Sequence, residues 1–278
     1  MRIALRLLTA AAVLGCLASP ALADWNVGDP HKMHFPQLPD LDTGMDVLAM
    51  TPYPGDPAIG KVVADDWRCT STGPVTDIHI WGSWLNDVFP HDASGVPDPG
   101  AVTFRLSIHS DIPATPTTYS RPGELLREFT FQPGSFQWRD WGTAPNEVFY
   151  DPNQNEIIGS DSRVIQYNFF FDPAEAFQQE AGTIYWLDVS ASFDPNDPAV
   201  FGWKTSQDHF NDDSVYADYV PGQTIDPSQW IEMFDPRTGV SLDQAFVITP
   251  EPGTLVLLAI GAAAGGFVCL VRRRKRRQ

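Results

Sequence analysis

The sequence predicts an all-β protein whose body is a single antiparallel β-sandwich of the jelly-roll type. Short runs of β-branched, aromatic and alternating residues recur along the chain. Between them lie Asp-Pro pairs, which favour turns, beginning at Asp98, Asp151 and Asp194 among others. Helical periodicity is scarce, and the best helical stretch, 173–180, is short enough to be a connection.

The first segment of the chain, residues 1–23, is typical of a signal peptide. It has two arginines, an apolar run and then the small residues Ala21 and Ala23 at the spacing that a signal peptidase accepts. We expect cleavage there to leave Asp24 at the new N-terminus. The alternative is an uncleaved membrane anchor, which the short apolar run disfavours.

Residues 24–60 form a proline-rich segment that should run over the surface with at most one strand. Residues 61–249 form the predicted sandwich domain. Alternation of polar and apolar residues over 103–109 indicates an antiparallel sheet with one apolar face. The expected strands are 61–69, 75–85, 101–110, 124–131, 163–171, 183–192, 200–205 and 242–248.

The last segment, residues 250–278, combines a short motif with a predicted membrane helix. Pro250, Glu251 and Pro252 precede an uncharged stretch, 254–271, that is long enough to span a bilayer. A basic cluster follows and should stay in the cytoplasm, which places the body across the membrane. The cluster consists of Arg272, Arg273, Arg274, Lys275, Arg276 and Arg277.

This arrangement resembles the PEP-CTERM sorting signal that exosortases process in Gram-negative bacteria. The resemblance implies that signal peptidase and an exosortase act on the protein during export. It also implies that the helix anchors the protein in the membrane before processing, after which the body reaches the cell surface or an exopolysaccharide matrix. The alternative is a plain single-span anchor, in which the G-x-x-x-G pattern at 261–265 offers a dimerising face.

Parts of the body also resemble a secreted bacterial domain of unknown function that recurs in PEP-CTERM proteins. The resemblance spans most of 61–248, supports a single domain and brings no biochemical activity with it. The stretches that carry it are 63–67 (VADDW), 76–79 (TDIH), 81–84 (WGSW), 201–206 (FGWKTS) and 208–213 (DHFNDD).

The exported part of the chain is strongly acidic. Of 18 Lys and Arg residues, two lie in the signal and six in the basic cluster, so ten remain against 35 Asp and Glu, a net charge of −25. Such a surface repels phosphate backbones, so we expect no nucleic-acid partner and favourable association with cations. Cys69 is the one cysteine of the body, which therefore has no internal disulfide, and we expect it to be buried.

Calcium is the inorganic partner that the residues favour, although no motif requires a cofactor. Carboxylate and amide oxygens, the ligands calcium prefers, crowd several turns. Solvated turns are the alternative, because Asp and Asn favour turns on their own account. The candidate ligands are Asp151, Asn153, Asn155 and Glu156 in one loop, and Asp208, Asp212 and Asp213 in another, with a comparable run at Asp40, Asp42 and Asp46.

We expect Trp138 and Trp141 to be exposed and to contact glycans, whereas the other tryptophans should fill the core. No nucleophile or zinc motif is present, and the adjacent carboxylates Asp65 and Asp66 should point to opposite faces of a strand. We therefore expect no catalytic residues. The leading hypothesis is a non-enzymatic structural, adhesive or polysaccharide-contacting protein. The alternative is a secreted glycan-acting hydrolase, which needs two carboxylates facing each other across a cleft.

Overall fold

The computed structural model describes residues 24–172 and 174–249. The expected signal peptide at 1–23 and the sorting tail at 250–278, with its membrane helix, lie outside these residues. Within the described ranges no helix has the length and apolar character needed to cross a membrane. The described residues from Asn26 onward belong to one compact unit.

The described chain is all-β, as predicted. Each of the eight expected strands is present, with ends shifted by a few residues or, at 242–248, with a one-residue break. The strands are β1 (Met45–Leu48), β2 (Gly60–Arg68), β3 (Gly73–Pro74), β4 (Asp77–Trp84), β5 (Thr103–Ile112), β6 (Arg121–Phe131), β7 (Gln137–Asp151), β8 (Glu156–Phe170), β9 (Gln178–Gln179), β10 (Ile184–Ser192), β11 (Phe201–Ser206), β12 (Val215–Tyr219), β13 (Ile231–Glu232), β14 (Asp243–Gln244) and β15 (Phe246–Thr249), with 3-10 turns η1 (Leu85–Asp87) and η2 (Pro227–Gln229).

The helical expectation for 173–180 is wrong. Asp172 instead starts a turn, because its side chain accepts a hydrogen bond from Ala174 N and its carbonyl accepts from Glu175 N. The chain then extends into β9, which pairs with β3. Pairing with another strand outweighs the weak helical preference of this short segment.

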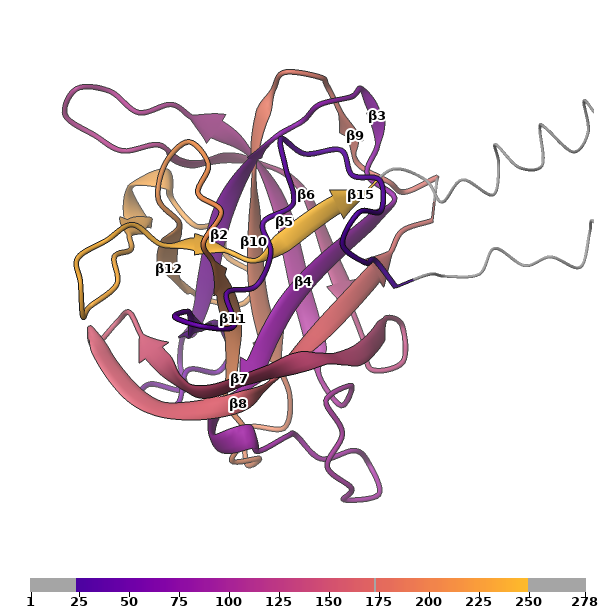
Figure 1. The fold of residues 1–278 in the computed structure, drawn as a ribbon, viewed down its shortest axis with the longest axis vertical. Coiled ribbons are helices and arrows are strands. Elements are labelled where there is room, and N and C mark those ends of the chain that lie inside the picture. Colours follow the sequence, from indigo (N-terminus) through magenta and orange to yellow (C-terminus); the bar gives the residue numbers. More distant parts are fainter. Residues whose placement is uncertain (1–23, 173, 250–278) are drawn as a thin grey trace, which may run out of the picture. The chain divides into compact units, whose positions relative to one another are not determined.

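Two large sheets make up most of the domain (Figure 1). One has the strand order β13-β12-β2-β10-β5-β6, and the other has the order β14-β11-β1-β7-β8-β4-β15. Antiparallel pairing dominates both sheets, as predicted. One pair departs from that expectation, since β1 runs parallel to β7. The reason is topological: β1 comes from the proline-rich segment and enters between β7 and β11.

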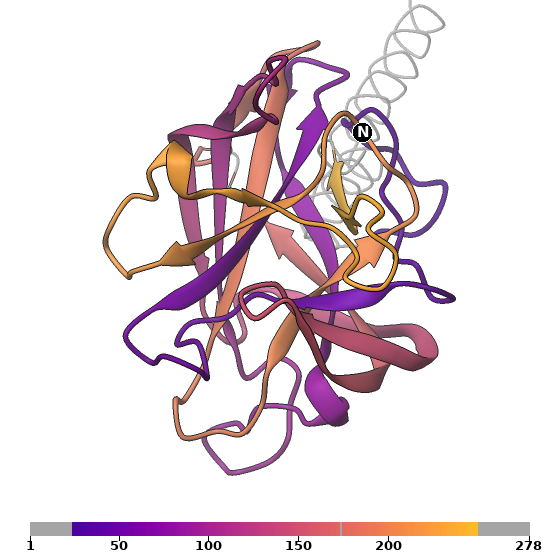
Figure 2. The ribbon, with the colours of Figure 1, turned by 90° about the vertical axis from the view of Figure 1, so that its left-hand side faces the viewer.

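The second sheet closes on itself, because β11 pairs with β4 as well as with β1. Strands β11, β1, β7, β8 and β4 therefore form a closed ring, which we call the five-strand ring. Its curvature comes largely from the long β7–β8 hairpin, which curls strongly in Figures 1 and 2. The pairing of these two strands shifts register at three places, and such bulges bend a sheet.

Aromatic side chains from the two sheets meet in the core. Phe104 of β5 contacts Phe169 of β8 and Phe201 of β11, with ring centroids 5.3 and 5.2 Å apart. Trp67 of β2 lies against Phe246 of β15. Fully buried tryptophans are Trp67, Trp81, Trp84, Trp186, Trp203 and Trp230, and Cys69 is buried, as expected.

The proline-rich segment contributes the single strand β1 and crosses the end of the second sheet. Lys32 N donates to Ile248 O, and Gln37 N donates to Phe246 O, so this segment pairs with β15. It then turns at Asp40 and leads into β1. The turn brings residues 40–45 next to the end of β11, where an open surface hollow lies.

Candidate functional site

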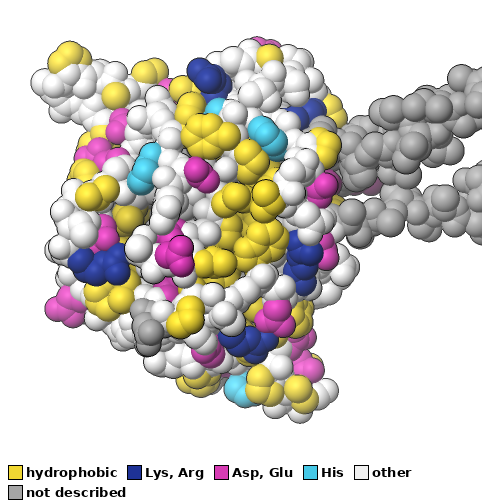
Figure 3. All heavy atoms as spheres, viewed as in Figure 1, with side chains coloured by type: hydrophobic (Ala, Val, Ile, Leu, Met, Phe, Trp, Pro, Cys, Tyr) yellow, Lys and Arg dark blue, Asp and Glu magenta, His cyan; other side chains and the backbone are white. Residues whose placement is uncertain are grey.

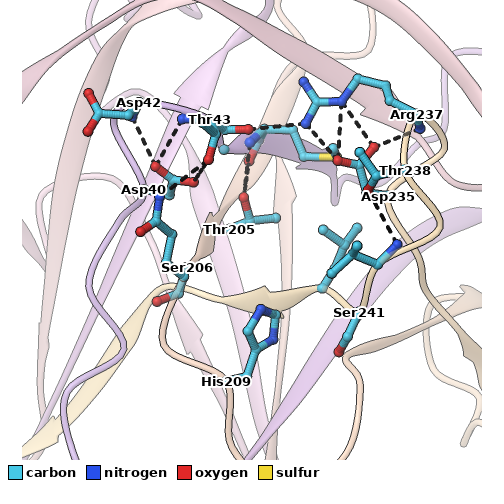
Figure 4. A pocket seen from close by; sticks show the side chains of 15 residues that line it. Asp40, Asp42, Thr43, Thr205, Ser206, His209, Asp235, Arg237, Thr238 and Ser241 are labelled. Atoms are coloured by element: carbon cyan, nitrogen blue, oxygen red, sulfur yellow. Dashed lines mark hydrogen bonds and ion pairs between the residues drawn. The ribbon is translucent and has the colours of Figure 1, made fainter.

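An open hollow of about 660 Å³ lies where residues 40–45, the end of β11 and the loop before β14 meet (Figure 4). Hydroxyl groups, carboxylates and one guanidinium dominate its polar lining. The polar lining residues are Asp40, Asp42, Thr43, Thr205, Ser206, Gln207, His209, Asp235, Arg237, Thr238 and Ser241. Apolar side chains of Met45, Val240 and Leu242 complete the lining, so the hollow suits a ligand that has both hydrogen-bonding groups and apolar faces, as sugar rings do.

One wall of the hollow is the turn that follows Asp40. Its carboxylate accepts hydrogen bonds from Asp42 N at 2.9 Å, Thr43 N at 3.0 Å and Thr43 Oγ1 at 2.6 Å. Desolvation would raise the pKa of Asp40, but these hydrogen bonds outweigh it and lower the pKa below the ordinary value. The Asp40 carboxylate is therefore ionised at neutral pH.

The opposite wall carries an ion pair between Asp235 and Arg237. The guanidinium donates to both carboxylate oxygens and also to the Thr43 carbonyl, at 3.1 Å, so it ties the two walls together (Figure 4). Desolvation opposes the pairing, yet the hydrogen bonds from Arg237 lower the pKa of Asp235. This second carboxylate is ionised as well.

His209 lies at the edge of the hollow and pairs with a buried carboxylate. Its Nδ1 lies 3.0 Å from Asp243 Oδ1, and this hydrogen bond raises the pKa of the imidazole. The pair has the geometry of a base with its orienting acid. No hydroxyl among the described residues forms a hydrogen bond with Nε2, so a nucleophile is not in place beside it.

A cluster of charged side chains lies next to the hollow, within the five-strand ring. Asp46, Glu147 and Asp161 come from β1, β7 and β8, and one carboxylate oxygen of each lies within 4.8 Å of the others. Lys204 of β11 joins them: its Nζ contacts Glu147 Oε1 and lies 4.0 Å from Asp46 Oδ2. Ser83 of β4 completes the set, which we call the ring cluster.

The ring cluster is almost completely shielded from solvent. The side chains of Lys204 and Asp46 are 0% exposed and that of Glu147 is 2% exposed. Among the described residues, the carboxylate oxygens of Asp46 and Asp161 have no hydrogen-bond partner of ordinary geometry, although Ser83 lies close enough to lower the pKa of both, and Glu147 is paired with Lys204. Unpaired polar groups at such depth are costly and call for an explanation.

Burial shifts the ionisation of the ring cluster toward neutral forms. Desolvation raises the pKa of Asp46 to about 6, although the positive charge of Lys204 opposes the rise. It raises the pKa of Asp161 to about 9, with the charges of Asp46 and Asp87 adding to the effect. Desolvation lowers the pKa of Lys204, against the opposing effect of Asp46.

Comparison with protein families gives two matches along the chain. Residues 33–249 match DUF7901, a domain of unknown function. The chain belongs to the DUF7901 family. Residues 249–276 match the PEP-CTERM protein-sorting motif, which confirms the resemblance found at the C-terminal end. The protein is therefore exported and sorted by an exosortase at the membrane. No curated protein matches the chain.

In this DUF7901 domain the first predicted calcium loop forms the tight turn between β7 and β8. Asp151 accepts hydrogen bonds from Tyr53 Oη at 2.6 Å and Asn153 N at 2.9 Å. Asn155 has a φ of 52° and accepts a hydrogen bond from Tyr150 Oη. Glu156 is exposed at the start of β8. The side-chain oxygens of Asp151 and Asn155 thus bind protein groups in a turn, and calcium at this loop stays a prediction.

The second predicted calcium loop is partly assembled. Asp212 and Asp213 come together with Glu232 of β13, a residue that the sequence did not single out, and the three carboxylates lie within 4.8 Å of one another. Desolvation, followed by the charges of Asp213 and Asp212, raises the pKa of Glu232 to about 7. Asp208 lies apart and accepts a hydrogen bond from Leu38 N. Calcium at this loop stays a prediction.

The two tryptophans predicted to contact glycans lie on β7 and do not line the hollow. Trp138 is 37% exposed. Trp141 is half-buried, packs edge-on against Trp81 with centroids 5.1 Å apart, and lies beneath the Arg139 guanidinium. Their glycan role stays a prediction.

Asp65 and Asp66 are both buried on β2 and have different partners, as expected for residues on opposite faces. Asp65 accepts hydrogen bonds from Gln37 Nε2 and Gln244 N, whereas Asp66 accepts from Asn211 Nδ2. Burial raises the pKa of each well above the ordinary value. They act as internal polar links rather than as an open site.

The surface seen in Figure 3 carries scattered acidic groups, few basic ones and a central apolar strip. No extended basic patch appears on this face, which fits the acidic composition of the exported part. A polyanion would therefore find little electrostatic attraction here.

Proposed function

We propose that the exported body is a non-enzymatic cell-surface or matrix β-sandwich that contacts polysaccharide through the open hollow. The observation that carries this proposal is the polar lining of the hollow, whose two walls are joined by Arg237. Ionised Asp40 and Asp235 can accept hydrogen bonds from sugar hydroxyls, and neighbouring hydroxyl and amide groups can donate and accept them. A neutral, polyhydroxylated ligand matches these groups best.

The pKa directions in the hollow favour binding over hydrolysis. Glycoside hydrolysis by the usual route needs one carboxylic acid that keeps its proton, beside a second carboxylate. Asp40 and Asp235 both have lowered pKa values, so neither retains a proton for a leaving group. This supports the binding role and weighs against the alternative of a secreted glycan-acting hydrolase.

The test is a calorimetric titration of the exported body with neutral oligosaccharides from bacterial exopolysaccharide. Arg237→Ala removes the guanidinium that joins the walls, and we expect the affinity to fall by about tenfold or more. Gln207→Ala, at an exposed position of the lining, should weaken binding without affecting folding. Arg127→Ala is the matched control, since Arg127 lies on β6 outside the hollow.

Two outcomes would contradict the proposal. One is binding that is unchanged in both lining variants, or absent altogether. The other is release of new reducing ends when the protein is incubated with the polysaccharide, which would favour the hydrolase. Melting curves of each variant, recorded beside the titrations, separate loss of contact from loss of fold.

A further inference from the structure

The ring cluster contains the components of an amide-forming reaction between side chains. Lys204 supplies an amine, Glu147 supplies a carboxyl group in contact with that amine, and Asp46 supplies a second carboxyl group 4.0 Å from Nζ. These three groups are the most deeply buried charged set of the five-strand ring. We propose that Lys204 and Glu147 become joined by an isopeptide bond, with Asp46 as the proton-transfer group.

The order of the strands in the second sheet brings Lys204, Asp46 and Glu147 together. Strand β1 lies between β11 and β7, and Asp46 is the direct cross-strand partner of Lys204. On its other side Asp46 pairs with Phe149, two residues from Glu147 and hence on the same face of β7. The carboxyl group of Asp46 thus lies beside the amine and the carboxyl group that would be joined.

Burial favours the protonation states that the reaction requires of Lys204 and Asp46. An amine attacks only in its neutral form, and desolvation favours that form of Lys204. Asp46 has to lend and recover a proton, and its raised pKa suits that exchange near neutral pH. In water these groups would remain an ion pair. Burial of these side chains within the five-strand ring removes most of the water that would hold them in their charged forms.

The bond changes balance without any further reactant. The Lys204 nitrogen attacks the Glu147 carboxyl carbon and forms a C–N bond. Asp46 donates a proton to the departing hydroxyl group, which leaves as water when its C–O bond breaks. Asp46 then recovers a proton from the nitrogen and ends unchanged. One amine and one carboxylic acid become one amide and one water.

The released water has a route out of the cluster. Glu147 also lines a small polar cavity of about 50 Å³, which shares Asp42, Thr43, Gly44 and Arg237 with the open hollow. A cavity of this size is large enough for a water molecule. The amide that remains would be less costly to bury than the two charges it replaces.

Neighbouring positions are consistent with a cross-link at this point. Gly44 lies close to the amine, since a Cβ there would be 2.9 Å from Lys204 Nζ. The cross-link would join β11 to β7 across β1, the strand that enters the ring from the N-terminal segment. In a body with one cysteine, a side-chain amide is a covalent alternative to a disulfide.

The test is peptide mapping of the purified full chain after trypsin digestion. Without the bond, cleavage gives separate peptides 140–163, 164–204 and 205–237. With it, Lys204 is not cleaved, and a branched product of 140–163 and 164–237 appears that is lighter than its two parts by one water. We expect the branched product to predominate and the free peptide 164–204 to be absent.

Two variants test the roles proposed for Lys204 and Asp46. Lys204→Arg keeps a positive charge but cannot form the bond, and Asp46→Asn removes the proton-transfer group, so both should abolish the branched product. Lys61→Arg is the matched control, because Lys61 is also buried and pairs with Asp218. It should leave the branched product intact.

Separate peptides from the wild-type chain would overturn the proposal, whatever the variants do. So would a branched product that persists in Lys204→Arg. If the peptides are separate and a calcium chelator lowers the melting temperature, one of the carboxylate clusters of the body holds a cation, and the isopeptide assignment is wrong.

Discussion

Asp77, at the start of β4, shows at the residue scale how burial links stability to pH. Its side chain accepts a hydrogen bond from Thr249 Oγ1 and is largely shielded from solvent. Desolvation raises its pKa to about 6, more than the hydrogen bond lowers it. The folded state therefore favours the protonated form. The contribution to stability is full below pH 4 and is lost as the pH rises through 6.

The substitution Asp77→Asn should remove this pH dependence. At pH 7 the wild-type carboxyl group is ionised at a cost, so we expect the variant to be more stable by about 1–3 kcal/mol. At pH 4 the two proteins should have nearly equal free energies of unfolding. Urea unfolding at both pH values measures the difference. Glu124→Gln, at an exposed position of β6, is the control for the loss of a carboxylate. Equal gains at both pH values would contradict the assignment.

His79 acts in the opposite direction. Desolvation lowers its pKa to about 4, although the hydrogen bond with Asn168 opposes the shift. Because a buried neutral histidine must gain charge in acid, its contribution is present above pH 6.5 and lost as the pH falls toward 4. Buried carboxyl groups with raised pKa values, such as Asp77, therefore reduce stability at higher pH, whereas His79 reduces it at lower pH.

At the element scale, Gly202 determines how closely three strands of the five-strand ring approach. A Cβ at this position of β11 would lie 2.6 Å from Phe149 Cζ and 2.8 Å from Asp46 Cβ. Neither atom can move far, because Phe149 and Asp46 are both buried in the neighbouring strands. Only glycine fits without displacing β1 or β7.

We therefore expect Gly202→Ala to lower the free energy of unfolding by about 1–3 kcal/mol through overpacking. Gly142→Ala is the control, since the nearest atom to its added Cβ, Leu41 Cδ1, is 3.6 Å away. That variant should change stability by less than about 1 kcal/mol. Urea unfolding of the two proteins gives the comparison, and equal losses would show that the ring is not tightly packed at Gly202.

Local patterns predicted eight strand-forming stretches and missed several strands, of which β7 is the longest. Strand β7 was missed because Gly142 and Pro145 interrupt it, and both lie where its pairing with β8 shifts register. Strand β1 was allowed for in the proline-rich segment but not located. Its parallel pairing with β7 joins residues about a hundred positions apart, which no local pattern reports.

Because β1 and β7 were not located from the sequence, the candidate sites were not predicted either. Asp46 and Glu147 lie on β1 and β7, so the sequence offered no strand on which to place them together. One signal was available: Lys204 is a charged residue within the apolar run of β11, a position where a lysine needs a partner. No comparable sequence signal pointed to Arg237, because its partner Asp235 belongs to an Asp-Pro pair like those in other turns.

At the scale of the whole molecule, export and sorting follow from the C-terminal motif. We expect the form recovered from the cell surface to lack the residues after Pro252, and mass analysis of its C-terminal peptide tests this. Glu251→Ala should leave the tail in place, whereas Glu180→Ala, at an exposed position outside the motif, should not. An intact tail on the wild-type surface form would mean that the protein keeps its anchor.

The position of β15 has a consequence for the order of events during export. This strand ends at Thr249, directly before the sorting motif, yet it pairs with β4 and with the N-terminal segment at Ile248 and Phe246. If the chain crosses the membrane N-terminus first, as the predicted signal peptide implies, β15 arrives last. The second sheet therefore lacks one of its strands until the sorting motif reaches the membrane. The final step of folding and the start of sorting then coincide in time and place, so a slow-folding variant would present an open sheet edge to the sorting enzyme.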